Sequence, residues 1–216
     1  MSSRSAGPGD TARPGDTPDP DGRTRRRIVV AISGASGAVY GTRLMEVLSA
    51  MPDIELHAII SAGAAATIRY EVGIEPRDVE ALADRVYNER NLAAPLASGT
   101  FLTDAMVVAP CSIRSLSAIA NSANDSLIVR AADVHLKERR RLVLVVRETP
   151  LHEGHLRLMT LATRAGAVIL PPVPGFYIRP TTIAELVDHT VGKVLDSIGV
   201  SHELTPRWSG IAEHEN

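Results

Sequence analysis

The feature that most constrains the fold is an alternation, from Ile28 onward, of short aliphatic runs with longer segments of helical periodicity. The short runs carry Val, Ile and Leu at successive positions, as strands buried on both faces of a parallel sheet require. The predicted strands are residues 28–33, 54–60, 105–110, 142–148 and 167–170. The predicted helices lie at residues 37–50, 62–72, 77–86, 112–122, 125–139, 153–165 and 182–198.

This order predicts an α/β fold, a doubly wound Rossmann-like or flavodoxin-like parallel sheet with helices on both faces. A chain of 216 residues with 44% apolar residues suits a single domain. Aromatic residues make up only 3% of the chain, so we expect a core of Ala, Val, Leu and Ile. In such a fold ligands bind at the carboxyl ends of the strands, and we expect every candidate site residue on that edge.

The domain is expected to span residues 28–208, between a disordered tail at 1–27 and a short C-terminal tail at 209–216. Residues 1–22 are rich in Pro, Gly, Asp, Ser and Thr and offer almost nothing to bury. The arginines that follow are interpreted as a solvated lead-in to the first strand. These are Arg23, Arg25, Arg26 and Arg27.

A formal net charge of −2 provides no field that would draw the chain to nucleic acid or to an anionic membrane, so small-molecule chemistry is expected. No stretch approaches the roughly 20 apolar residues of a spanning helix. The N-terminus also lacks the apolar section of a secretion signal. We therefore expect a cytoplasmic protein.

The first predicted strand leads into a glycine turn, "ISGASGAVYG", that differs from the G-x-G-x-x-G spacing of dinucleotide folds. Ala35 and Ser36 occupy the tight part of the turn, and backbone N–H groups at the start of the following helix, together with a serine hydroxyl, suit an anion such as a phosphate. The second strand ends at Ser61, where a dinucleotide enzyme would place a carboxylate for the ribose. This favours a mononucleotide ligand. The alternative is a turn needed only for packing the helix on the sheet.

The third strand ends in a similar way, in "VVAPCSIRSLSAIAN". Ser112 and Ser115 stand at a predicted helix start, where hydroxyl side chains are preferred as caps. With Arg114 beside them, they are candidates for a second contact with the ligand. Cys111 is interpreted as a buried packing residue, because no histidine partner is evident nearby.

The segment "IVRAADVHLKERRRLVLVVRETP" carries a cluster of cations. Arg130 and Lys137 are seven residues apart, nearly on the same helix face, and are expected to converge on one anion. Arg147 and Glu148 follow a buried strand at the edge where ligands gather, and they are candidates for binding phosphate or moving a proton. The alternative is a surface helix with salt bridges.

The C-terminal part offers further candidates. Tyr177 lies on the Pro-rich loop "PPVPGFYIRP", and Lys193 lies on the helix that follows. Trp208 is interpreted as either a hydrophobic plug or an aromatic wall for a ligand cation. His152 and His155 have no third ligand at a suitable spacing, so no metal site is expected.

Several of these motifs resemble the UbiX/Pad1 flavin prenyltransferases, over about residues 28–208. The segments that carry the resemblance are "ISGASGAVYG", "APCSIRSLSAIANSANDSLIVRAADVHLKERR", "LVLVVRETPLHEGHL", "GAVILPPVPGFYIRP" and "DHTVGKVLD". The resemblance implies that reduced FMN receives a prenyl group from dimethylallyl monophosphate at N5 and C6. It also implies that the prenylated FMN serves a UbiD-type decarboxylase and that the chain forms a homododecamer.

Carried over by position, the resemblance implies that Tyr177 and Lys193 hold the dimethylallyl phosphate. The residues implied to hold FMN are Gly34, Ala35, Ser36, Ser61, Ser112, Ile113, Arg114, Ser115 and Arg147. The residues expected to act in catalysis are Glu148, Lys137, Arg130 and Trp208. Glu148 is expected to assist proton movement, and Trp208 to shield the allylic cation from water. Many members have threonine in place of Ser115, and Glu71 is a weaker candidate for facing the site.

Two rival functions remain open from the sequence. One is an FMN-dependent cysteine decarboxylase of the same fold, which would need a histidine base and a substrate clamp that are not evident in the sequence. The other is an accessory subunit of a hydroxyarylate decarboxylase, a role that a supplied cofactor would explain.

Overall fold

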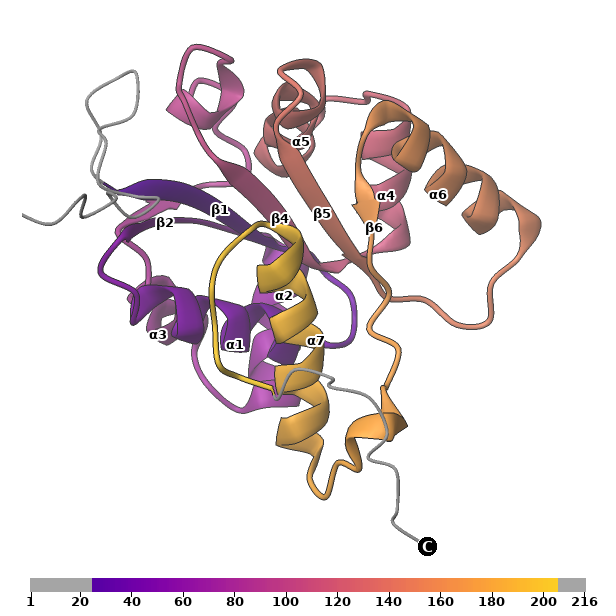
Figure 1. Cartoon of the computed structure of the whole chain (residues 1–216). Coiled ribbons are helices and arrows are strands. Elements are labelled where there is room, and N and C mark those ends of the chain that lie inside the picture. Colours follow the sequence, from indigo (N-terminus) through magenta and orange to yellow (C-terminus); the bar gives the residue numbers. More distant parts are fainter. Residues whose placement is uncertain (1–24, 206–216) are drawn as a thin grey trace, which may run out of the picture.

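The computed structural model describes residues 25–205 and contains a six-stranded parallel sheet in the order β3-β2-β1-β4-β5-β6 (Figure 1). The strands are β1 (Arg26–Ile32), β2 (Ile54–Ile60), β3 (Arg85–Tyr87), β4 (Ala105–Cys111), β5 (Arg141–Val146) and β6 (Val168–Ile169). This confirms the predicted doubly wound α/β fold. The order reverses between β1 and β4, and the crevice at such a reversal is where ligands bind.

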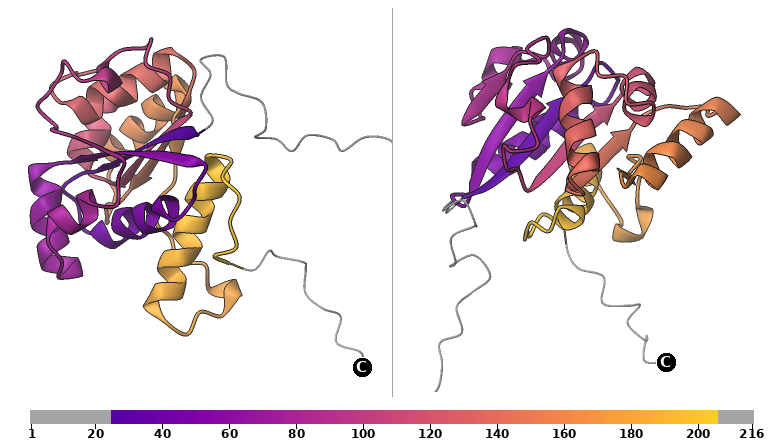
Figure 2. Two further views of the ribbon diagram at one scale, coloured as in Figure 1. Left: turned by 90° about the vertical axis from the view of Figure 1, so that its left-hand side faces the viewer. Right: turned by 90° about the horizontal axis from the view of Figure 1, so that it is seen from above.

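Helices cover both faces of the sheet (Figure 2). On one face lie α1 (Ala38–Ser49), α2 (Ala62–Thr67), the π-helical turn η1 (Ile68–Val72), α3 (Pro76–Glu80) and α7 (Ile183–Ser197). On the other face lie α4 (Ile113–Ala120), α5 (Leu127–Lys137) and α6 (Glu153–Ala165). Two 3₁₀ turns, η2 (Pro95–Ala97) and η3 (Phe176–Ile178), lie in the connections.

The sheet separates two apolar clusters, because successive side chains of a strand point to opposite faces. In β1, Ile28, Val30 and Ile32 pack with α1 and α7, whereas Val29 and Ala31 pack with α4 and α5. All five are fully buried. The aliphatic runs of the sequence therefore form the middle layer of the fold, as predicted.

The first strand begins earlier than predicted, so Arg26 and Arg27 belong to the sheet and not to a solvated tail. Arg27 pairs with Glu55 of β2, with Nε and Oε2 at 2.9 Å, and its guanidinium lies over the ring of Phe101 at 4.7 Å. Arg26 donates hydrogen bonds to the carbonyls of Ile198 and Gly199. These contacts give the two arginines a place in the fold that their charge alone did not indicate.

Strand β3 was not predicted, because a helix was expected over 77–86. The structure ends α3 at Glu80 and places Arg85–Tyr87 at the edge of the sheet beside β2. A strand of three residues is too short to show a two-residue period.

Among residues 25–205, none of the helices has the length and apolar character needed to span a membrane.

Candidate active site

A cavity of about 620 Å³ opens at the carboxyl edge of the sheet, at the ends of β1, β2 and β4. Most of its lining is small or hydroxyl-bearing: Ser33, Gly34, Ser61, Ala62, Gly63, Ser112, Ser115, Ala118 and Ser126. Its remaining lining is Glu89, Arg90, Ile113, Arg114, Asp125, Ile128, Val129 and Glu148. Six of the predicted FMN-binding residues and Glu148 are thus brought together. These six are Gly34, Ser61, Ser112, Ile113, Arg114 and Ser115.

Three helices begin at this cavity, and each is capped by a serine that lines it. Ser61 accepts a hydrogen bond from the N–H of Ala64 (3.0 Å) at the start of α2, and Ser112 accepts one from the N–H of Ser115 (3.2 Å) at the start of α4. Ser126 caps α5 in the same way. Helix N-termini carry partial positive charge, so the three ends together favour a ligand with an anionic group.

Ser33 links the two strands on either side of the crevice. Its hydroxyl donates to the carbonyl of Pro110 (2.8 Å) and accepts from the N–H of Ser112 (2.8 Å). Ser33 is buried and was not predicted as a site residue. It fixes the end of β1 against the start of α4, which positions the Ser112 cap.

Gly34 and Gly63 bring the turn after β1 against α2. A Cβ atom on Gly34 would lie 3.0 Å from the Cα of Gly63, a contact so tight that the backbone of Gly63 would have to shift. The two glycines allow this approach without a shift, and the cavity floor between them is bare backbone. A flat ring system can rest on such a floor.

Glu71, on η1, closes the turn between β1 and α1. Its carboxylate accepts hydrogen bonds from the N–H groups of Gly37 (2.8 Å) and Ala38 (3.0 Å). Partial burial acts to raise the pKa of Glu71, but hydrogen bonds from Ser36 and from these two N–H groups outweigh it, and the pKa lies below its ordinary value. Two of the N–H groups predicted to bind an anion of the ligand are therefore held by the chain's own carboxylate.

We expect Glu71→Gln to lower the free energy of unfolding by about 0.5 kcal/mol at neutral pH, because an amide lacks the charge that stabilises a helix N-terminus. The pKa of Glu71 is lower in the folded chain than in the unfolded chain. Its contribution is therefore present above the ordinary glutamate pKa and is lost as the pH falls through the folded-state pKa. Urea unfolding at neutral and acid pH measures this, with Glu80→Gln on α3 as the control. Equal stability of Glu71→Gln and the native chain at neutral pH would contradict it.

Glu89 was also missed by the sequence analysis. It follows β3, lines the cavity and accepts a hydrogen bond from the N–H of Ala62 (3.0 Å) at the start of α2. Glu89 lies in an irregular segment, and no spacing in the sequence points to it. Ser126, by contrast, precedes the apolar helical run "LIVRAA", and this is a pattern from which a cap is predictable.

Arg147 and Glu148 lie at the predicted edge but are not buried as a pair. Strand β5 ends at Val146, Arg147 is exposed, and Glu148 is half-buried and lines the cavity. Burial raises the pKa of Tyr40 on α1, and the positive charge of Arg147 opposes this, which places Arg147 on the α1 side of the crevice. Within one chain, neither charge is therefore withdrawn fully from solvent.

The structure does not bring Arg130 and Lys137 together at the cavity. Helix α5 begins at the cavity with Ser126, and Lys137 in its last turn is about 16 Å further along the helix axis. Lys137 forms an ion pair with Glu138. Arg130 donates to the carbonyl of Ala97 (3.0 Å) and to the carboxylate of Asp133 (3.2 Å).

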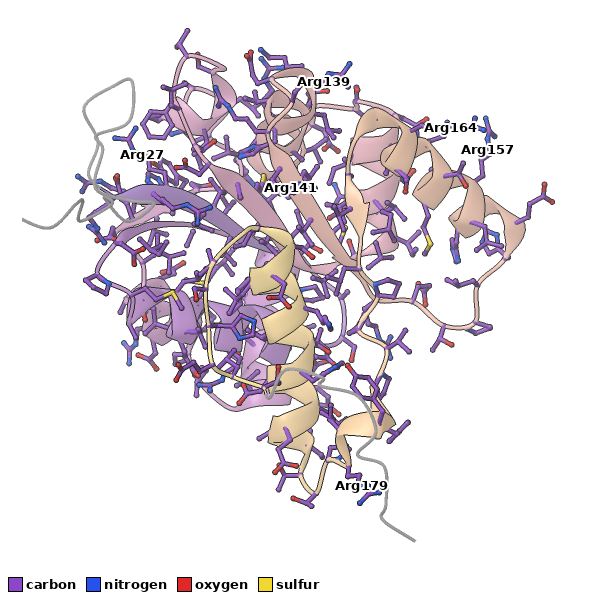
Figure 3. The ribbon with its side chains drawn as sticks, in the orientation of Figure 1. Arg27, Arg139, Arg141, Arg157, Arg164 and Arg179 are labelled. Carbon is purple, nitrogen blue, oxygen red and sulfur yellow. The ribbon has the colours of Figure 1, made fainter. Side chains whose placement is uncertain are left out.

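Within one chain, Arg130, Lys137 and Lys193 therefore do not meet at one cavity, and their convergence on one anion stays a prediction. In Figure 3, Arg139, which follows the end of α5, lies at the upper end of the molecule, and Arg179, on the segment before α7, lies at the lower end. A spacing of seven residues fixes the helix face of two side chains but not the end of the sheet to which the helix carries them.

Lys193 and Tyr177 lie beside a second depression. A groove of about 390 Å³ between α7 and the end of β6 is lined by Leu170, Pro171, Val173, His189, Thr190, Lys193, Asp196 and Ser197. The hydroxyl of Tyr177 contacts Nε2 of His189 at 3.0 Å. The two residues predicted to hold the prenyl donor are thus near each other, although Ala35, Ser36 and Arg147 stay outside both linings. Trp208 and the tail at 209–216 lie outside the described residues.

Cys111 is fully buried, and burial raises the pKa of its thiol to about 12. This confirms its interpretation as a packing residue. His152 caps α6, with Nδ1 accepting from the N–H of Gly154 (3.0 Å), which confirms a helix-start role. Within residues 25–205 no group of three or more His, Cys, Asp or Glu side chains is arranged to hold a metal ion.

Comparison with known proteins identifies relatives of this chain. The Flavoprotein family model matches residues 17–199. The chain is 52% identical over 187 residues to the flavin prenyltransferase UbiX of Escherichia coli strain K12, which covers 86% of this chain and 99% of that protein.

Two solved structures share its fold and much of its sequence. A crystal structure of AnUbiX in complex with FMN and dimethylallyl pyrophosphate matches with a TM-score of 0.85 and 51% identity, over 87% of this chain and 99% of that one. A dodecameric FMN-dependent UbiX-like decarboxylase from Escherichia coli O157:H7 matches with a TM-score of 0.84 and 44% identity, over 85% of this chain and 100% of that one.

Proposed function

The chain belongs to the UbiX family of flavin prenyltransferases, and from this we propose that it joins a dimethylallyl group to N5 and C6 of reduced FMN, with dimethylallyl monophosphate as the donor. The observation that carries the proposal is the 51% identity and common fold with a chain crystallised with FMN and dimethylallyl pyrophosphate. Reduced FMN supplies the nucleophilic ring atoms when it is bound. The tasks of the protein are to hold the flavin, neutralise the leaving phosphate and move a proton.

The cavity at the carboxyl edge suits FMN. Its volume of about 620 Å³ lies in the range of sites for ligands of this size. The bare backbone of Gly34 and Gly63 leaves room for a flat ring, and the serine caps supply hydrogen-bonding groups and helix N-termini for an anionic ligand. We assign FMN binding to Gly34, Ala35, Ser36, Ser61, Ser112, Ile113, Arg114, Ser115 and Arg147.

We assign the phosphate of the prenyl donor to Lys193 and Tyr177. Lys193 is exposed at the groove, where an ammonium group is able to neutralise charge that develops on a leaving phosphate. The hydroxyl of Tyr177 adds a hydrogen-bond donor. Glu148, which lines the FMN cavity, is assigned the movement of a proton, and Trp208 the shielding of the allylic cation.

Arg130 and Lys137 are assigned to the same phosphate, but from a neighbouring copy of the chain. Within its own chain Lys137 is too far from the cavity, so a contribution from it requires a homo-oligomer. Exposed apolar side chains support such an assembly: Val173, Phe176 and Ile183, on the segment from β6 to α7, are 70%, 71% and 79% exposed. We propose a homododecamer, because the similar UbiX-like decarboxylase from Escherichia coli O157:H7 is dodecameric. The proposed recipient of the product is a UbiD-type decarboxylase, and the proposed location is the cytoplasm.

Anaerobic incubation of the purified protein with reduced FMN and dimethylallyl monophosphate tests this function. We expect the flavin to gain the mass of one five-carbon prenyl unit, measured by mass spectrometry of the extracted flavin. Omitting the prenyl donor is the control. An unchanged flavin mass with both substrates present would overturn the proposal. In a separate incubation with oxidised FMN and a peptidyl cysteine, loss of carbon dioxide with reduction of the flavin would indicate the rival decarboxylase activity.

A further inference from the structure

His189 on α7 was not predicted as a site residue, but it lies between Tyr177 and Lys193. Its side chain is buried, its Nε2 is 3.0 Å from the hydroxyl of Tyr177, and the two rings meet edge to face with centroids 5.6 Å apart. Tyr177 is 53% exposed on a short 3₁₀ turn. The contact with His189 therefore holds the hydroxyl end of this ring in a defined place.

Gly175 shows that this contact is built into the loop. A Cβ atom at this position would lie 2.7 Å from Cε1 of His189 and 3.1 Å from Cε1 of Tyr177. Any larger residue would have to push one of the rings away. The backbone of Gly175 has φ of −98°, so the glycine is required by space and not by its conformation.

The groove beside His189 carries the charge that an anion needs. Lys193 is four residues further along α7, on the same helix face, and both side chains line the groove. Asp196 also lines the groove, and Nε2 of His202 is 3.4 Å from one of its carboxylate oxygens. Asp188 is turned to the far side of α7, where it pairs with Arg43 of α1 (2.7 Å).

Burial lowers the pKa of His189, and the positive charge of Lys193 lowers it further. The imidazole is therefore neutral at neutral pH, and one of its two nitrogens carries a proton. When Nε2 carries it, the imidazole donates to the phenol oxygen of Tyr177, and the phenol directs its own O–H elsewhere. An anion next to Lys193 favours this arrangement, because it accepts the hydrogen bond from the phenol.

We propose that His189 is a positioning residue that holds the hydroxyl of Tyr177 beside Lys193, so that both groups bind the phosphate of the prenyl donor together. This inference rests on the proposed function and deepens it. The imidazole also has a second task, which is to take up a proton when phosphate binds. An anion that neutralises Lys193 removes the repulsion that disfavours the protonated form of His189.

The affinity of the groove for phosphate is expected to depend on pH. Binding of a phosphate raises the affinity of His189 for a proton, so binding takes up protons between the two pKa values of His189, without and with the anion. The affinity for a given ionic form of the donor therefore increases as the pH falls through this interval. A variant in which residue 189 does not titrate lacks this increase in affinity. Ionisation of the donor itself affects the native chain and the variant alike, so the difference between them isolates His189.

Steady-state kinetics of prenyl transfer with four variants, two of them in the Tyr177→Phe background, tests the proposal. We expect His189→Phe to raise KM for dimethylallyl monophosphate by about 10-fold with kcat changed much less, because a hydrogen bond to the group that binds the phosphate is lost. His189→Gln can still bond to Tyr177, so it should restore KM at neutral pH but lack the acid-dependent gain in affinity of the native chain. In the Tyr177→Phe background, His189→Phe should have almost no further effect.

A second tyrosine and histidine pair provides a matched control. The hydroxyl of Tyr87 lies 2.9 Å from Nδ1 of His57, on β3 and β2 and away from α7, and Tyr87→Phe should leave KM unchanged. The positioning role is overturned, and the proposed function stands, if native protein prenylates FMN but His189→Phe has the native KM. The same holds if His189→Phe raises KM by the same factor in the native and the Tyr177→Phe backgrounds. Native protein that leaves FMN unchanged overturns both.

Discussion

Glu148→Gln is expected to slow prenyl transfer by about 100-fold or more, because an amide of the same shape cannot take up or release a proton. Glu148 lines the cavity that we assign to FMN, and its side chain accepts a hydrogen bond only from the adjacent Thr149 N–H (3.0 Å) among the described residues. Its charge is thus not needed to hold another element in place. The rate of appearance of prenylated FMN, measured in a single turnover, gives the effect.

FMN should remain bound to Glu148→Gln with an affinity within a few-fold of the native chain. Glu153→Gln, an exposed position at the start of α6, is the matched control and should keep the native rate. Loss of flavin from Glu148→Gln would mean that the carboxylate binds the ligand, and a native rate would remove Glu148 from the reaction.

Co-assembly of two inactive variants is expected to restore activity, because Lys137 is far from the cavity of its own chain. We expect Lys137→Ala alone to slow prenyl transfer by about 100-fold, through loss of a cation at the leaving phosphate. In mixed oligomers of Lys137→Ala and Glu148→Gln chains, about a quarter of the sites combine a native Lys137 with a native Glu148 from another chain. Hybrids purified through two different tags should therefore regain about that fraction of native activity.

The two variants mixed after separate purification, without exchange of subunits, are the control and should stay inactive. Hybrids with no more activity than either variant would show that Lys137 does not act on a neighbour's cavity. A native rate for Lys137→Ala alone would remove the residue from the site altogether.

The sheet and most of its helices were predictable from the sequence because burial on both faces leaves an unmistakable aliphatic run. β2 was predicted with its observed bounds at 54–60, and α6 at 153–165. Strand β3 was not predictable, since its three residues are held at the sheet edge by pairing with β2 and carry no pattern of their own. Arg26 and Arg27 were predicted to lie in a solvated tail because their charge gives no sign of a strand. Only their partners elsewhere in the fold, Glu55 and the carbonyl of Ile198, show that they belong to the sheet.

The site was predictable where a local motif carries it. Ser112 was found because a hydroxyl directly after a strand marks a helix start. Ser61 was found because it stands at a strand end where a dinucleotide enzyme would place a carboxylate. The positions of Lys137 and His189 depend on where whole helices run and on what packs against them, and neither is encoded by nearby residues. Glu71 was only a weak candidate for the same reason, as its partners Gly37 and Ala38 are more than thirty residues earlier in the chain.

The π-helical turn Ile68–Val72 carries Glu71, whose hydrogen bonds join this segment to α1. Whether Glu71 reaches α1 depends on the number of residues in α2 and the turn. It extends α2 with a wider turn, and in this register Glu71 reaches the first N–H groups of α1. Shortening the segment by one residue would rotate everything after the deletion by about 100° around the helix axis. When this helix is trimmed or grafted, the number of its residues therefore matters more than their identity. A shorter segment would leave the N-terminus of α1 without the carboxylate of Glu71.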